Sequence, residues 1–113
     1  MSKQEKIEEK LVKLRESVLN IALRDGSISE DERMVLNSIS FNIDNLIDNL
    51  DQAFEDDIIT PDEKKELKSL VKRVEDDAES IASYDEYLSK DEASILNRLK
   101  YALLDINSNI DKL

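Results

Sequence analysis

The chain has 113 residues, of which 40% are hydrophobic and 38% are charged, and its formal net charge at pH 7 is −11. It contains no His and no Cys, so it lacks the commonest general base, a thiol nucleophile and any disulfide, and its single Gly cannot form a glycine-rich phosphate loop. We therefore expect no enzymatic activity and no resident cofactor. The acidic surface also repels phosphate, which argues against nucleic-acid or membrane partners.

The composition favours one helical domain covering residues 1–113. One Gly and one Pro among so many charged residues are typical of a helical protein rich in ion pairs. No apolar run is long enough to span a membrane. The first residues, Met1-Ser2-Lys3-Gln4-Glu5, are charged where a signal peptide needs an apolar stretch, so we expect a cytoplasmic protein.

One sequence pattern occurs three times, over residues 25–32, 56–63 and 85–92, and it divides the chain into helices. Each copy begins with an acid and ends in a capping box, in which a Ser or Thr is followed three residues later by Glu. The boxes are Ser29 with Glu32, Thr60 with Glu63 and Ser89 with Glu92, and Ser2 with Glu5 adds one at the start of the chain. These boxes predict four helices joined by short loops, which makes consecutive helices antiparallel neighbours.

The first helix is predicted over about residues 3–24, before Gly26, which suits a left-handed helix stop. Its apolar seam, with spacings of three and four residues, consists of Ile7, Leu11, Leu14, Val18 and Ile21. Val12, Leu19 and Leu23 lie beside this seam and indicate contacts beyond one neighbouring helix. A basic row consists of Lys3, Lys6, Lys10 and Lys13.

The second helix is predicted over about residues 30–55 and again carries more apolar residues than one seam needs. Its seam consists of Leu36, Ile39, Ile43, Leu46, Leu50 and Ala53, and the additional apolar residues are Met34, Val35, Phe41, Ile47 and Phe54. An acidic row consists of Asp44, Asp48, Asp51 and Glu55.

The third and fourth helices are predicted over about residues 61–84 and from residue 90 toward the C-terminus. The third seam consists of Leu67, Leu70, Val74, Ala78 and Ile81, and the fourth of Ile95, Leu96, Leu99, Leu103, Ile106, Ile110 and Leu113. No Glu is expected to interrupt the apolar seams, so a carboxylate-bridged metal site inside the core is not predicted.

The charged rows predict which helices lie side by side. Antiparallel pairing about the first turn places Lys10, Lys6 and Lys3 opposite Asp44, Asp48 and Asp51, respectively. Pairing about the second turn places Lys64, Lys68 and Lys72 opposite Glu55, Asp51 and Asp48. One row of acids cannot pair with both rows of bases at once. We expect the pairs that form to set the orientation and register of the helices, and each exposed pair to stabilise the fold by roughly 0.2–1 kcal/mol.

The predicted fold is all-α, an up-down-up-down bundle of four long antiparallel helices with short capped turns. The alternative is a set of helical hairpins that complete their core by homo-oligomerisation, which the surplus apolar residues of the first two helices would favour. Such an up-down bundle places the first and third turns at one end and the second turn at the other.

The first repeated turn resembles the second half of an EF-hand calcium loop, with Asp25, Ser27 and Glu32 as candidate metal ligands. The opening ligand positions then fall on Ile21 and Leu23, which cannot coordinate calcium, so helix capping is the preferred interpretation. The turn is also similar to the acidic inter-helix loops of the TerB tellurite-resistance family. That resemblance covers about a dozen residues and implies Asp25 and Glu32 as site residues, although the helices predicted here are longer.

The favoured function is a non-catalytic assembly or protein-interaction module. Its partner would be another protein or a second copy of the chain, as a dimer or larger homo-oligomer, bound through the surplus apolar residues Val12, Leu19, Leu23, Phe41, Ile47 and Phe54. One alternative is divalent-cation binding at the Asp-rich turns. Another is an acidic decoy that binds a basic protein. Tyr84, Tyr87 and Tyr101 supply most of the aromatic surface for recognition.

Overall fold

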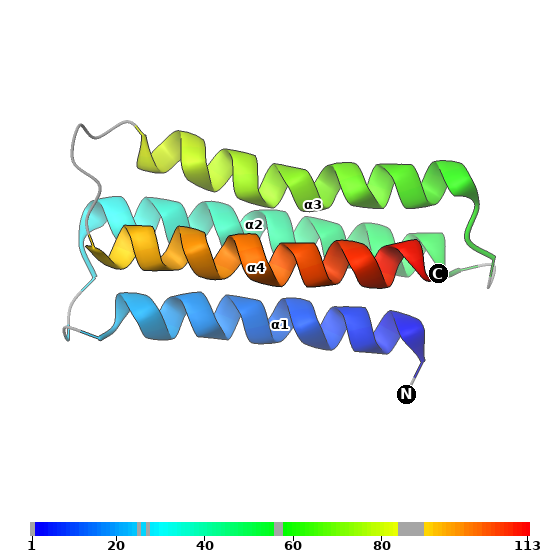
Figure 1. Cartoon of the computed structure of the whole chain (residues 1–113), viewed down its shortest axis with the longest axis horizontal. Coiled ribbons are helices and arrows are strands. Elements are labelled where there is room, and N and C mark those ends of the chain that lie inside the picture. Colours follow the sequence, from blue (N-terminus) through cyan, green and yellow to red (C-terminus); the bar gives the residue numbers. More distant parts are fainter. Residues whose placement is uncertain (1, 25, 27, 56–57, 84–89) are drawn as a thin grey trace.

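The protein is a four-helix bundle (Figure 1), seen in a computed structural model that describes residues 2–24, 26, 28–55, 58–83 and 90–113. The helices are α1 (Lys3–Ala22), α2 (Glu30–Ala53), α3 (Pro61–Ala82) and α4 (Lys90–Asp111). The bundle measures 44 × 25 × 19 Å. Within the described residues, no helix is long and apolar enough to cross a membrane.

The helices run up, down, up and down around one core, which confirms the predicted fold. α1 and α3 each pack against both α2 and α4, and α2 also touches α4 across the diagonal. Figure 1 shows that the ends of α1 and α3 and the starts of α2 and α4 lie at one end of the bundle. The two termini and the start of α3 lie at the other end, so the first and second turns are at opposite ends, as predicted.

Side-chain caps start the first three helices where the sequence predicts. The hydroxyls of Ser2, Ser29 and Thr60 accept hydrogen bonds from the amides three residues ahead, at 3.1, 3.2 and 3.1 Å. At α3 the box is complete, because Glu63 Oε1 also accepts from the Thr60 amide at 3.1 Å. Each cap satisfies a helix amide that has no partner within the helix. The box at Ser89 lies outside the described residues.

Three helices end two residues earlier than predicted. The Arg24 amide bonds to the Ile21 carbonyl at 3.3 Å, and the Glu55 amide bonds to the Gln52 carbonyl at 3.2 Å. These bonds span three residues instead of four, so the chain tightens into turns just after α1 and α2. Gly26 follows with a φ of +80°, the left-handed conformation that the sequence predicts for it.

The core contains the predicted seams of α1 and α2 and part of those of α3 and α4, where Leu70, Ile81, Leu96 and Leu113 are only half-buried. In α3, Val71 and Ala82 are buried instead.

The core also contains two unexpected carboxylic acids. Glu32 and Glu92 are only 6% and 3% exposed, so the prediction that no Glu interrupts the seams is wrong. Both residues stand three positions before a fully buried core residue, Val35 in α2 and Ile95 in α4. In these two helices the Glu position of the predicted capping box is therefore also a position that faces the core.

The predicted charge pairs between α1 and α2 and between α2 and α3 are largely wrong. Lys10 Nζ lies 2.6 Å from Asp105 Oδ2, and Lys68 Nζ lies 2.7 Å from Asp111 Oδ1. Lys10 of α1 and Lys68 of α3 thus reach α4 instead of the acidic row of α2. That row finds other partners on α1, because Asp44 pairs with Arg15 and Asp51 accepts from the amide of Gln4.

Candidate interaction surface

The surplus apolar residues of α1 form an exposed stripe along the edge of the helix that flanks α2. Val12, Leu19 and Leu23 are 36, 43 and 47% exposed. Arg15 lies three residues after Val12 and four before Leu19, so it shares their side of the helix. Because Arg15 pairs with Asp44 of α2, the stripe borders the α1–α2 contact.

On α2 the most exposed apolar residue is Phe41, at 73%. It lies three residues before Asp44 and therefore next to the ion pair with Arg15 on the helix surface. We call Val12, Leu19, Leu23 and Phe41 the α1–α2 apolar face. Apolar side chains that are exposed singly are ordinary, whereas apolar side chains that neighbour one another on one side of the molecule can form a contact surface.

The other two predicted interaction residues are placed differently. Ile47 and Phe54 are half-buried and pack against the core. They support the inner side of α2, and little of their surface remains for a partner. Surplus apolar residues in a sequence thus divide between a wider core and an open surface, and the apolar pattern alone does not separate the two.

A carboxyl pair bridges α1 and α2 at the opposite end of this face from Leu23. Gln4 Nε2 donates to Asp51 Oδ1 at 2.8 Å and to Glu8 Oε1 at 3.4 Å. The hydrogen bond with Asp51, partial burial and the repulsion of the Asp51 charge raise the pKa of Glu8 from 4.5 to about 7. Glu8 therefore binds its proton more tightly than an ordinary Glu does, and protonation of Glu8 relieves its repulsion of Asp51.

The predicted cation ligands are not brought together in the described part of the chain. Asp25 and Ser27 lie outside the described residues, and Glu32 is buried at the start of α2. Among the described residues, no group of three or more Asp or Glu residues converges as a metal site. Tyr84 and Tyr87 also lie outside the described residues.

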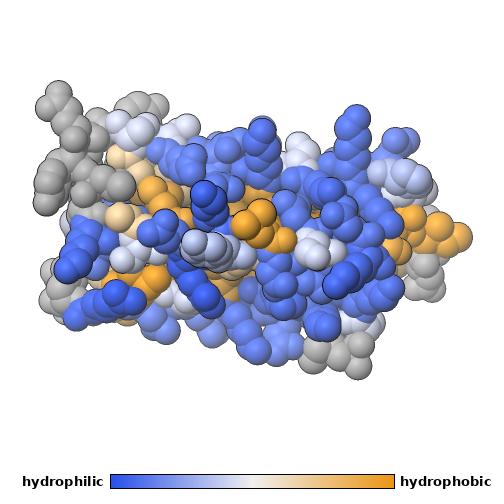
Figure 2. Space-filling model, in the orientation of Figure 1, coloured by the Kyte–Doolittle hydropathy of each residue, from blue (hydrophilic) through white to orange (hydrophobic). Residues whose placement is uncertain are grey.

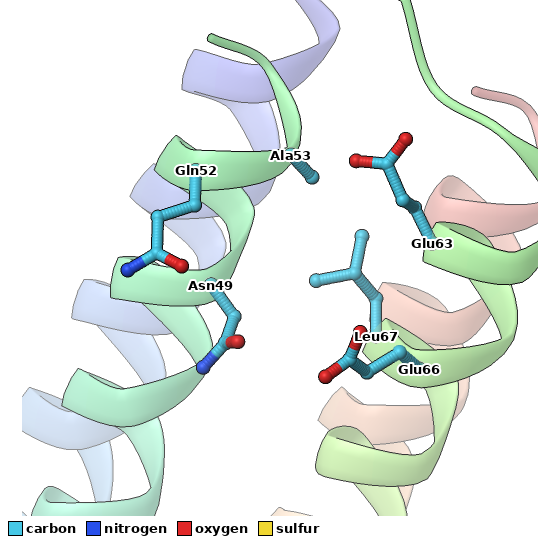
Figure 3. Close-up of a pocket in the computed structure, with 6 residues that line it drawn as sticks. All are labelled: Asn49, Gln52, Ala53, Glu63, Glu66 and Leu67. Atoms are coloured by element: carbon cyan, nitrogen blue, oxygen red, sulfur yellow. The ribbon is translucent and has the colours of Figure 1, made fainter.

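Next to the second turn, a small cavity of about 180 Å³ lies between α2 and α3. Figure 3 shows its lining residues, which are Asn49, Gln52 and Ala53 on α2 and Glu63, Glu66 and Leu67 on α3. One of its two carboxylates, Glu63, already caps α3 through the Thr60 amide. The cavity is therefore polar, and part of its acidic lining serves the fold.

The bundle face that carries α4 in front is mostly hydrophilic, with apolar side chains in small separate areas (Figure 2). A second cavity opens between α1 and α4, and it is lined in part by Lys10, Lys13, Arg98 and Tyr101. The sequence patterns do not predict this cavity, because the charged rows place Lys10 opposite Asp44 of α2. The sequence predicts Tyr101 as part of the aromatic surface for recognition but gives no link between it and these bases.

Comparisons of the chain with family models, curated proteins and solved structures found no match. The similarity of the first turn to TerB loops is therefore not accompanied by a match to a family model.

Proposed function

We propose that this protein is a non-catalytic interaction module that binds a basic amphipathic helix along the α1–α2 apolar face. The observation that carries the proposal is the exposed stripe of Val12, Leu19 and Leu23, on a helix whose opposite side already fills the core. Removal of an apolar side chain from water is favourable. For a side chain that is exposed in the folded bundle, only a binding partner can provide this stabilisation.

The stripe has the spacing that suits a helical partner. Its residues stand seven and four positions apart, which is the spacing at which one helix presents anchors to another. Phe41 adds a large aromatic surface beside them, and aromatic residues are frequent among the side chains that dominate binding energy. A partner with apolar residues at the same spacing would cover all four.

The charges around the face favour a basic partner over a second copy of the chain. α2 carries six Asp or Glu residues, of which Glu32 is buried, and one Arg, and α1 adds the exposed Glu16 near the stripe. Two such faces brought together would repel each other, whereas Lys and Arg flanking an apolar stripe would be attracted. This charge pattern unites the predicted interaction role with the alternative of an acidic protein that binds a basic one.

The test is titration calorimetry with a synthetic amphipathic peptide of Leu and Lys residues, whose leucines repeat at helical spacing. We expect binding to the bundle to weaken at least fivefold in the variant Leu19→Ser. The matched control is Leu104→Ser, an exposed leucine of α4, and it should bind as the parent does. An acidic version of the peptide, with Glu in place of Lys, should not bind.

Two outcomes would contradict the proposal. Equal binding by the two Ser variants would mean that the peptide is attracted by net charge without using the apolar face. A stable dimer in light scattering that Leu19→Ser dissociates and Leu104→Ser leaves intact would assign the face to a second copy of the chain.

A further inference from the structure

The cavity between α1 and α4 lies apart from the α1–α2 apolar face and has a volume of about 300 Å³. Two cross-helix contacts bound it, Lys10 Nζ to Asp105 Oδ2 at 2.6 Å and Arg98 Nε to Ser17 Oγ at 3.0 Å. The bounding residues of each helix are seven positions apart, so the opening is roughly 10 Å long.

The cavity has an apolar floor and an aromatic wall. Leu14 and Ile106 are buried core residues that line it from α1 and α4, and the half-buried Ala102 lies beside them. Tyr101 is 70% exposed, so most of its ring is open to solvent at this position. A flat apolar group placed here would contact the floor and the ring together.

The rim of the cavity is basic, although acids outnumber bases 27 to 16 in the whole chain. Lys10, Lys13 and Arg98 line it against the single carboxylate of Asp105. Within the described residues, no carboxylate pairs with Arg98, whose guanidinium contacts the Ser17 hydroxyl. Lys13 pairs with Glu9 of its own helix, and both side chains are well exposed, so that pair is easily exchanged for another anion.

We propose that this cavity binds a small organic monoanion, a carboxylate or sulfonate attached to a flat apolar body. The anionic group would lie between Arg98 and Lys13, where the planar guanidinium can donate two parallel hydrogen bonds. The body would lie on Leu14 and Ile106 against the ring of Tyr101. A single charge suits the site, because the net charge of −11 repels polyanions such as nucleotides.

The probe for the test is 8-anilinonaphthalene-1-sulfonate, an aromatic sulfonate whose fluorescence rises when it leaves water. We expect saturable binding that weakens at least fivefold in Arg98→Gln. The matched control Arg73→Gln, on the exposed side of α3, should bind as the parent does. Amide chemical shifts of the parent should move mainly in residues 10–17 and 98–106 on titration.

A neutral relative of the probe, N-phenyl-1-naphthylamine, separates the charge from the apolar body. It should bind more weakly than the sulfonate and equally well to the parent and to Arg98→Gln. Circular dichroism melts of each variant confirm that the bundle is intact before binding is compared. Undiminished binding of the sulfonate by a folded Arg98→Gln variant, or shift changes centred on Leu19 and Phe41, would overturn the proposal.

Discussion

The single glycine of the chain illustrates what one residue contributes to this fold. Gly26 follows α1 with a φ of +80°, and its amide bonds to the Leu23 carbonyl at 3.0 Å. A Cβ built at this position meets no atom within 4 Å. Space is therefore available for a side chain, and the requirement for glycine comes from the backbone conformation alone.

We expect Gly26→Ala to lower the free energy of unfolding by about 1 kcal/mol, because a left-handed φ brings the added Cβ close to the following carbonyl oxygen. Gly26→Asn should lower the free energy of unfolding by less, since Asn adopts the left-handed conformation more readily than most other residues. Urea denaturation of the three proteins measures the order. A loss with Asn as large as with Ala would contradict the backbone explanation.

At the same scale, the burial of Glu32 and Glu92 shows where sequence reasoning stopped. The capping rule predicts both residues from the hydroxyl three positions before them. The seam rule also reaches them, since each precedes a core residue by three positions. The capping rule alone leaves such a residue exposed, and the seam rule alone expects an apolar residue at its position. Their agreement is the signal that would have found these buried acids.

Among the helices, a pair of acidic side chains at the contact between α1 and α2 makes the stability of the bundle depend on pH. Glu8, Asp51 and Gln4 meet at the open end of the pair, with the exposed Glu5 adding a negative charge from α1. The raised pKa of Glu8 means that the folded state holds a proton more tightly than the unfolded chain does. The corresponding stability is fully present below about pH 4.5 and is lost as the pH rises through about 7.

We expect Glu8→Gln to stabilise the bundle at pH 8 by roughly 1 kcal/mol, a value reduced for solvent screening, and to change little at pH 5. Thermal melts at both pH values measure the difference between variant and parent. The charge-matched control Glu16→Gln, an exposed residue of α1, should shift both melts equally. Glu75 also has a raised pKa, because of its burial and the charges of Glu79 and Asp76. Its contribution to the pH dependence is the same in the parent and in both variants, so it cancels in the comparison. An equal effect of Glu8→Gln at both pH values would contradict the raised pKa of Glu8.

The helices themselves were predictable, and their azimuthal arrangement was not. Capping boxes and seam spacing give the four helix starts and the core faces, because both depend on residues close in sequence. The basic row that includes Lys10 flanks its seam equally well whether α2 or α4 lies on that side. Long-range packing decides whether α2 or α4 lies beside this basic row. In the structure it is α4, because Lys10 pairs with Asp105. The cavity between α1 and α4 follows from the same choice.

For the whole molecule, the largest electrostatic feature is the excess of acids over bases. A net charge of −11 on a bundle with a radius of gyration of 14.6 Å produces self-repulsion that opposes the compact state. The cross-helix ion pairs involve side chains that are one-third to two-thirds exposed, so each offsets only a small part of that repulsion. Salt screens interactions over about 10 Å at 0.1 M, a distance smaller than the molecule.

We therefore expect the bundle to melt at a higher temperature as NaCl rises from 10 to 300 mM, by an amount equivalent to about 1 kcal/mol, or roughly 4–8 °C. The same series with CaCl₂ at equal ionic strength distinguishes screening from cation binding at the Asp-rich turns. If screening is the whole effect, the two salts give the same midpoint. A ligand specific for the folded state must raise the midpoint further, so an additional rise with calcium that saturates in the millimolar range would restore the cation-binding alternative. A midpoint that does not rise with NaCl would instead show that the carboxylates of this bundle do not oppose its folding.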